Sequence, residues 1–145
     1  MKIALGSDHG GYLVKKELIN FLNNNNIETI DVGTYSLDSC NYAEFGIKVG
    51  QLVANKEADF GIVICNSGEG ISIACNKVKG IRCGIGYNDE VAKLLRNHND
   101  ANVIAFGAHY QNIDEIKKRV LTFISEPFLG ERHQKRVDYI KNFEK

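Results

Sequence analysis

The sequence carries no excess of charge of either sign, because its 18 lysines and arginines balance its 18 aspartates and glutamates. A nucleic-acid-binding protein usually carries a basic excess, so this balance argues against such a partner. No apolar run approaches the ~20 residues that span a bilayer. The opening stretch 1–6 turns polar at Ser7, too early for a signal peptide. We therefore expect a cytoplasmic protein without a membrane partner, whose ligands are small molecules or further copies of the chain.

Metal-binding and disulfide patterns are also missing. The four cysteines include no Cys-x-x-Cys pair, and no two of the four histidines have ligand spacing on one helix face. This argues against zinc, and we expect no metal. In a reducing compartment the thiols are either buried or reactive. We predict that Cys75 and Cys83 lie in the core, and we assign no role to Cys40.

Strand-like and helical patterns alternate along the 145 residues, a length that predicts one domain over 1–145. Short apolar runs predict strands at 2–7, 27–33, 59–65, 80–86 and 102–106. Helical patterns fall between them, at about 13–22, 42–53, 71–77, after Asn88 and from Asn112, and the single Pro127 precedes a last helix at about 131–143. This order predicts an α/β fold, a three-layer α/β/α sandwich around a five-stranded parallel Rossmann-like sheet.

Ligands of open α/β sheets bind beyond the carboxyl ends of the strands, and two such segments carry reactive groups. Asp8 and His9 follow the first strand, where the next helix begins and its free amides attract anions. Cys65 ends the buried third strand, and the glycines after it let backbone N–H groups converge on a ligand oxygen. The alternatives are a capped turn with two exposed polar residues for the first segment and an inert core thiol for the second. The second segment also lacks the third glycine of a dinucleotide fingerprint, because Ile73 stands there.

Two further groups lie elsewhere in the chain. His98 and Asn99 end the fourth helix, and Arg132 and Arg136 are one turn apart on the last helix. Two arginines at that spacing suit a phosphate or a carboxylate. The alternatives are a histidine near the negative end of a helix dipole and a solvated basic face.

The segments taken together resemble ribose-5-phosphate isomerases of the B type, over nearly the whole chain from Met1 to about Ile140. The wider family includes galactose-6-phosphate and allose-6-phosphate isomerases. The resemblance is carried in order by Gly6-Ser7-Asp8-His9-Gly10-Gly11, the run from Cys65 to Lys77, Gly80-Ile81-Arg82, the run from His98 to Val103, and Gly130-x-Arg132-His133-x-x-Arg136-Val137.

The resemblance implies a metal-free aldose–ketose isomerase without a cofactor, which interconverts ribose 5-phosphate and ribulose 5-phosphate through a cis-enediol in the pentose phosphate pathway. It assigns Cys65 as the base that moves the proton between C1 and C2, with Ser67 assisting exchange of the hydroxyl protons. It assigns opening of the furanose ring to Asp8 and His98. The residues that it implies for substrate binding are His9, Tyr42, Asn66, Gly68, Glu69, Gly70, Asn99, Arg132 and Arg136.

In this family the site is completed across a homodimer or a dimer of dimers, which implies that the helix at 131–143 reaches a neighbouring subunit. Three departures from the family pattern leave the sugar open, namely Asn66 for glycine, Glu69 between two glycines, and His109 where many relatives carry an arginine. The alternatives are a hexose-6-phosphate isomerase, one subunit of a two-chain galactose-6-phosphate enzyme, and a non-catalytic phosphosugar-binding module.

Overall fold

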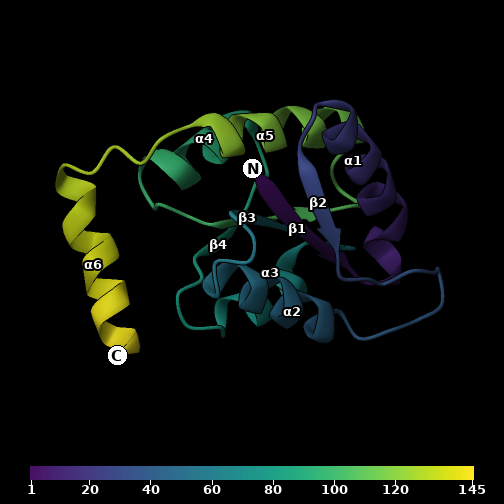
Figure 1. The fold of residues 1–145 in the computed structure, drawn as a ribbon, viewed down its shortest axis with the longest axis horizontal. Helices are drawn as coiled ribbons and strands as arrows, with labels where there is room; N and C mark the ends of the chain where they lie inside the picture. The colour runs from purple at the N-terminus through teal and green to yellow at the C-terminus, as the bar shows by residue number, and fades with distance from the viewer.

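Five parallel strands form the centre of the molecule in the computed structural model, which describes residues 1–145 (Figure 1). Their order across the sheet is β2-β1-β3-β5-β4, so β2 and β4 are the edges. The predicted five-stranded parallel sheet is confirmed. The strands are β1 (Lys2–Ser7), β2 (Glu28–Asp31), β3 (Phe60–Cys65), β4 (Cys83–Ile85) and β5 (Val103–Gly107).

The two edge strands are shorter than predicted. The predicted strand at 80–86 is reduced to three residues in β4, and that at 27–33 to four residues in β2. Each edge strand has a hydrogen-bonded neighbour on one side only. At the start of the predicted fourth strand the backbone makes a turn instead, in which the Ile81 N–H donates to the Val78 carbonyl. A local turn therefore replaces strand pairing before β4, whereas beyond β2 the Val32 N–H still donates to the Leu5 carbonyl of β1.

Helices cover both faces of the sheet, as predicted for a three-layer sandwich (Figure 1). One face carries α1 (Tyr12–Asn24), α4 (Asp89–Asn97) and α5 (Ile113–Ser125), whose apolar side chains form one buried cluster with the strands. The other face carries α2 (Tyr42–Ala54) and α3 (Glu69–Asn76), which form a second cluster. No helix has the length and apolar character needed to cross a membrane.

Side-chain caps fix where two of the predicted helices begin. The Asn88 side chain accepts a hydrogen bond from the Val91 N–H at 2.8 Å, and Asn112 accepts one from the Glu115 N–H at 2.9 Å. Such caps satisfy amides that the first helical turn leaves unpaired. α3 begins at Glu69, two residues before its predicted start, because Gly68 takes a left-handed conformation (φ 83°) that turns the loop directly into the helix.

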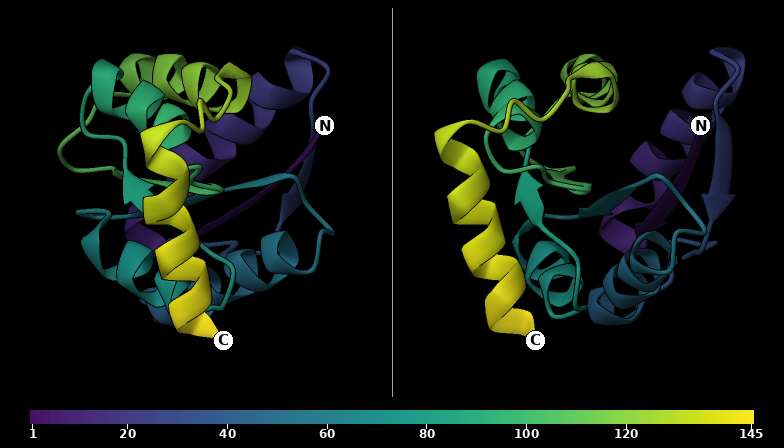
Figure 2. Two further views of the ribbon diagram at one scale, coloured as in Figure 1. Left: turned by 90° about the vertical axis from the view of Figure 1, so that its left-hand side faces the viewer. Right: turned by 60° about the vertical axis from the view of Figure 1, so that its left-hand side comes forward.

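The last helix, α6 (Arg132–Glu144), lies outside the three layers. Figure 2 shows it running past the β4 edge, from the layer of α4 and α5 towards that of α3. Only His133 and Val137 of this helix are buried. Hydrogen bonds connect both ends of this segment to the rest of the domain. Just before the helix, the Leu129 N–H donates to the Asn97 carbonyl, and at its last residue the Glu144 carboxylate accepts from the Gly80 N–H.

We expect Leu18→Ala to lower the free energy of unfolding by about 3–5 kcal/mol, because Leu18 is fully buried in the cluster under α1 and its loss leaves a cavity. The matched control is Leu13→Ala on the same helix, whose side chain is 62% exposed. That change should stay within about 0.5 kcal/mol. Urea unfolding of both variants measures the difference, and equal losses would contradict the packing described here.

Candidate active site

The carboxyl ends of β1, β3 and β5 lie side by side at one edge of the sheet. Ser7 pairs with Ile64 across β1 and β3, and Cys65 pairs with Gly107 across β3 and β5. The segments that follow these strands therefore meet at the same place, as parallel strands require. They are the two reactive segments of the sequence, together with the residues after β5.

Cys65 is the last residue of β3 and lies almost fully buried. Its Sγ accepts a hydrogen bond from the Gly68 N–H at 3.1 Å, which holds the sulfur against the loop that follows. The backbone N–H groups of Asn66 and Ser67 donate to no acceptor in the protein. The loop therefore presents one fixed sulfur and two backbone donors that remain available to a ligand.

Residues at the end of β5 hydrogen-bond to the loop that follows Cys65. The Ala108 N–H donates to the Cys65 carbonyl at 2.9 Å, and the His109 N–H donates to the Asn66 carbonyl at 3.0 Å. A Cβ added at Gly107 would come within 2.4 Å of the Ser67 carbonyl oxygen, so only glycine fits beneath the loop. The His109 ring lies edge-on to Tyr110, with 4.9 Å between the ring centroids.

Ser67 and Glu69 shape the start of α3. The Ser67 Oγ accepts a hydrogen bond from the Glu69 N–H at 3.2 Å. Both residues line a cavity of about 710 Å³ that opens towards β4. The Glu69 side chain is exposed there and forms no ion pair in the structure. Gly70 lies directly beneath the ring of Tyr42, since an added Cβ would come within 2.6 Å of it.

Asp8 and His9 form a single 3-10 turn (His9–Gly11) beside this loop. The Asp8 Oδ1 accepts hydrogen bonds from the N–H groups of Gly10 and Gly11, at 2.9 and 3.2 Å. The cap expected by the alternative interpretation is therefore present, but Asp8 is buried rather than exposed, and the cap uses only one of its carboxylate oxygens. Oδ2 accepts no hydrogen bond from the protein and remains free for a second partner.

The loop before α2 sets the tautomer of His9. The Cys40 N–H donates to the His9 Nδ1 at 3.2 Å, and the Cys40 thiol lies 3.9 Å from the same atom. A backbone N–H can only donate, so in neutral His9 the proton is on Nε2. We assigned no role to Cys40 from the sequence, and the structure corrects this for its backbone amide. No motif in the loop 34–41 signals the contact.

His98, Asn99, Arg132 and Arg136 are brought together, but not at Cys65. His98 and Asn99 follow α4 and precede β5, at the amino end of the sheet. Because β5 pairs with β3 from Val103 to Gly107, the strand length alone separates the two groups by ~13 Å at ~3.3 Å per residue. One chain therefore builds two half-sites at opposite ends of its sheet.

The half-site at the amino end is built around α6. His98, Asn99 and Arg136 line one cavity of about 790 Å³ between α6 and the β4 edge. The rings of His98 and His133 stack with 3.9 Å between centroids and 14° between planes. Arg132 and Arg136 are exposed and form no ion pair within the chain.

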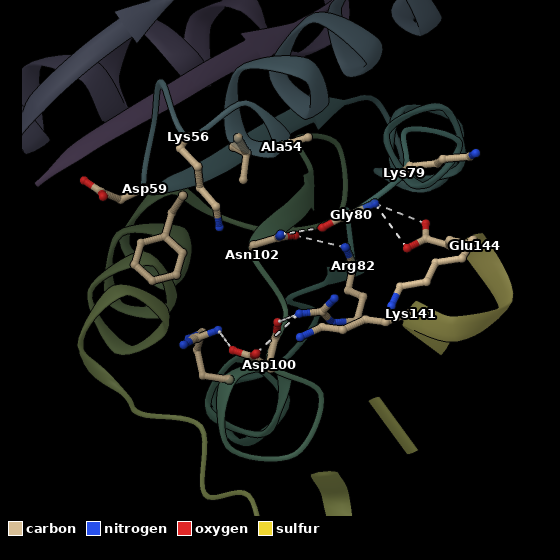
Figure 3. Close-up of a pocket in the computed structure, with 14 residues that line it drawn as sticks. Ala54, Lys56, Asp59, Lys79, Gly80, Arg82, Asp100, Asn102, Lys141 and Glu144 are labelled. Carbon is tan, nitrogen blue, oxygen red and sulfur yellow. Dashed lines mark hydrogen bonds and ion pairs between the residues drawn. The ribbon is translucent and has the colours of Figure 1, made fainter. Parts of the chain in front are cut away.

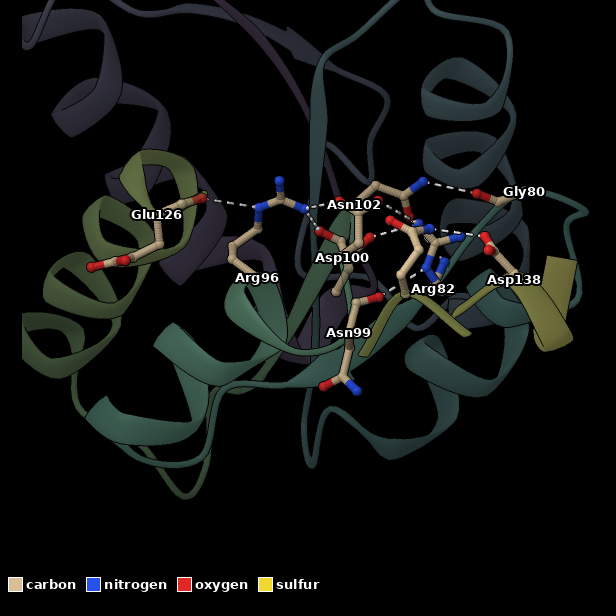
Figure 4. Close-up of polar contacts among 10 residues, drawn as sticks. Gly80, Arg82, Arg96, Asn99, Asp100, Asn102, Glu126 and Asp138 are labelled. Carbon is tan, nitrogen blue, oxygen red and sulfur yellow. Dashed lines mark hydrogen bonds and ion pairs between the residues drawn. The ribbon is translucent and has the colours of Figure 1, made fainter. Parts of the chain in front are cut away.

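Two arginines to which the sequence analysis assigned no role hold the segment after α4 (Figure 4). Arg96 donates to the Asp100 carboxylate at 2.9 Å and to the Ala101 carbonyl at 2.6 Å. Arg82 donates to the carbonyls of Asn99 and Asp100, at 3.0 and 2.6 Å. Burial lowers the pKa of Arg82, and the nearby Asp100 carboxylate opposes that shift. These bonds fix the backbone that carries His98 and Asn99.

Arg82 also forms part of the wall of a separate cavity of about 780 Å³, which Figure 3 shows with the side chains of Lys56 and Lys141 pointing into it. This cavity lies at the amino end of the sheet, beyond Asn102 and the Gly80–Glu144 contact. None of the residues predicted for the site lines it.

Comparison with known proteins shows the family and supports the fold. A family model described as ribose/galactose isomerase matches residues 3–140. The Escherichia coli ribose-5-phosphate isomerase B is 41% identical over 143 residues, covering 99% of this chain and 96% of that protein. A Clostridium thermocellum ribose-5-phosphate isomerase B structure superposes with a TM-score of 0.97 at 46% identity, covering 99% of this chain and 97% of the other. A Mycoplasma genitalium structure with bound ribulose-5-phosphate gives 0.94 at 34% identity, covering 99% and 95%.

We expect Gly107→Ala to destabilise the protein by about 1–3 kcal/mol, because its Cβ would displace the Ser67 carbonyl and the loop above it. Gly50→Ala on α2 is the control. There the added Cβ comes no closer than 3.0 Å to the Val78 side chain and 3.4 Å to the Cys75 carbonyl oxygen, a milder contact than the 2.4 Å at Gly107. Thermal unfolding of both variants tests this, and a neutral Gly107→Ala would mean that the end of β5 does not support the loop.

Proposed function

The chain belongs to the ribose/galactose isomerase family, and we propose that it is the aldose–ketose isomerase that interconverts ribose 5-phosphate and ribulose 5-phosphate. The observation that carries the proposal is the half-site at the carboxyl end of the sheet. There Cys65 offers a fixed sulfur beside unpaired backbone donors, in a chain that matches ribose-5-phosphate isomerases B over its full length. The relatives are named as sugar-phosphate isomerases, so the proposed chemistry and residue roles are those that the family resemblance implies, and the contacts around Cys65 support them.

Cys65 is the proposed base for the isomerisation. As the thiolate it removes the proton from C2 of the open-chain aldose, and as the thiol it returns that proton to C1, through an enediol whose oxygens lie on one side. Ser67 carries the hydroxyl proton between O1 and O2. The free N–H groups of Asn66 and Ser67 stabilise negative charge on the enediolate oxygen. A positioned base contributes about 10²–10⁴-fold, and each oxyanion donor about 10²–10³-fold.

Ring opening comes first and needs a second pair of groups. The free Oδ2 of Asp8 takes the proton of the anomeric hydroxyl, and His98 supplies a proton to the ring oxygen. His98 lies at the far end of the sheet from Asp8 in its own chain. The pair is therefore proposed to form between Asp8 of one protomer and His98 of another.

The residues proposed to bind the phosphate also come from both half-sites, and therefore from two protomers. His9 offers its Nε2 proton from the Cys65 half-site, since the Cys40 amide occupies Nδ1. Arg132 and Arg136 offer two guanidinium groups without an internal carboxylate partner, and Asn99 adds an amide for the sugar. Tyr42, whose ring lies against Gly70, is proposed to line the sugar in the Cys65 half-site. Arginine pairs suit phosphate because each guanidinium can donate two parallel hydrogen bonds.

We therefore propose a homodimer with two shared sites as the active unit. Apolar side chains on α6 support it, since Phe143 is 87% exposed and Tyr139 79% exposed in the single chain. Isolated surface residues of this kind are ordinary, but here they flank the half-site that lacks its base. Four free cysteines and a phosphorylated substrate support a cytoplasmic location.

A hexose-6-phosphate isomerase is the second candidate. The cavity of about 710 Å³ beside Ser67 and Glu69 is large enough for a further carbon of the sugar chain. The matching family model also includes galactose in its description.

A substrate panel distinguishes the candidates. We expect the purified chain, without another protein, to convert ribose 5-phosphate with a kcat/KM at least about tenfold above that for allose 6-phosphate or galactose 6-phosphate, because a substrate with the wrong length misplaces its reacting carbons. Formation of the ketose is followed directly. A higher kcat/KM for one of the hexose 6-phosphates would identify that sugar as the substrate instead. Activity on none of the three sugars would refute the proposal that the chain is an isomerase.

Cys65→Ala provides the control for that assay, with Cys75→Ala as its matched variant. Cys75 is fully buried in α3 and lies outside the site. We expect Cys65→Ala to lower kcat by at least about 10²-fold while ribose 5-phosphate still binds, and Cys75→Ala to retain most of the rate. Full activity of Cys65→Ala would remove this residue as the base.

The shared site makes a separate prediction. We expect Cys65→Ala and His98→Asn to be inactive alone and to recover about a quarter of the wild-type rate when equal amounts are unfolded and refolded together. The reason is that half of the dimers are then mixed, and each mixed dimer has one intact site. The steady-state rate before and after mixing measures the recovery, and its absence would mean that each chain completes its own site.

A further inference from the structure

The imidazoles of His98 and His133 form a parallel stack that the proposed reaction does not use. Their centroids are 3.9 Å apart and their planes differ by 14°. His133 is buried on α6, whereas His98 is partly exposed at the end of α4. One face of the His98 ring is therefore covered by His133, while the residue remains partly exposed and lines the cavity beside α6.

The surroundings of His133 disfavour its charged form. Burial lowers the pKa of His133, and the nearby His98, Arg132 and Arg136 lower it further, whereas Glu131 opposes them. Two stacked rings that were both cationic would repel each other. His133 therefore remains neutral near pH 7 and becomes charged only in more acid solution. The other titratable groups that line the cavity, from α3, β4, its preceding turn and the end of α6, are Lys77, Arg82, Cys83 and Glu144.

The stack is held from both sides by contacts within one chain. On the α6 side, Asn97 donates to the Pro127 carbonyl at 2.8 Å and accepts from the Leu129 N–H at 3.1 Å, so the end of α4 is tied to the segment leading into α6. On the other side, Arg82 and Arg96 hold the backbone that follows His98. His133 thus meets His98 at a fixed distance without help from a second copy.

We propose that His133 is a positioning residue, whose ring is a flat support that fixes the plane of His98 for opening of the sugar ring. The proposal rests on the role of His98 in the proposed function. Without the support, His98 turns about its own side-chain bonds, and the nitrogen that faces the ring oxygen is displaced. Misplacement of a reacting group by about 1 Å can cost about 10²-fold in rate.

Anomer exchange of ribose 5-phosphate labelled with ¹³C at C1 tests the proposal apart from isomerisation. In Cys65→Ala the sugar ring can still open and close, but the C2 proton is not removed, so magnetisation transfer between the two furanose anomers reports ring opening alone. Three further substitutions are each combined with Cys65→Ala. They are His133→Ala, His133→Phe and, as the matched control, Lys135→Ala on the exposed face of α6. Calorimetry with ribose 5-phosphate measures the Kd of each variant.

We expect His133→Ala to lose about 10–100-fold in catalysed anomer exchange with Kd changed less than about threefold. His133→Phe, which keeps a flat ring, should stay within about threefold of the background, and it should keep its rate to lower pH because phenylalanine does not titrate. Lys135→Ala should match the background. If His133→Ala does not fold, judged by thermal melting, His133→Leu takes its place as a side chain of similar volume without a flat face.

Three results would overturn the proposal. They are unchanged exchange in the variant without a ring, an equal loss in His133→Phe, and no catalysed exchange in the Cys65→Ala background. Failure of the proposed function would appear separately, as no isomerisation of ribose 5-phosphate by the unaltered chain.

Discussion

Parallel strand pairing is the constraint on which the site depends. Every strand points the same way, so a residue that ends a strand and a residue that precedes one lie at opposite ends of the sheet. Cys65 and Asp8 belong to the first kind, and His98 and Asn99 belong to the second. No loop of this chain crosses that distance between them. The proposed division of these residues between two protomers would let both groups contact one small substrate, and it would account for the position of α6 outside the three layers.

The half-site around Cys65 is built from the backbone more than from side chains. Gly107 allows the end of β5 to lie against Ser67, and an added Cβ at Gly11 would come within 2.5 Å of the Ile64 carbonyl oxygen. Close packing of this kind leaves the loop little freedom to rearrange. The sulfur and the free amides are consequently in place before a ligand arrives. Preorganised donors of this sort stabilise a developing oxyanion without further reorganisation.

The sequence was sufficient to predict the three layers and the two segments that meet beyond the carboxyl ends of β1 and β3. Continuous apolar runs marked the buried strands β1, β3 and β5, and the caps at Asn88 and Asn112 marked two helix starts. Residues that act through distant contacts left no local pattern. The Cys40 amide reaches His9 across 31 positions, and Arg96 reaches the Glu126 carbonyl across 30. Such contacts depend on how the loops pack, which periodicity and spacing do not encode.

The second half-site is assembled before any partner binds, and this bears on how a shared site forms. Asn97 ties the end of α4 to the start of α6, the two arginines fix the loop after His98, and His133 supports the His98 ring. Ordering such groups only on association would cost conformational entropy at each side chain, roughly 0.5–1.5 kcal/mol for the long ones. Here most of that cost is met during folding of the single chain. In the proposed dimer, association would then leave only the exposed guanidinium groups of Arg132 and Arg136 to be ordered on the phosphate.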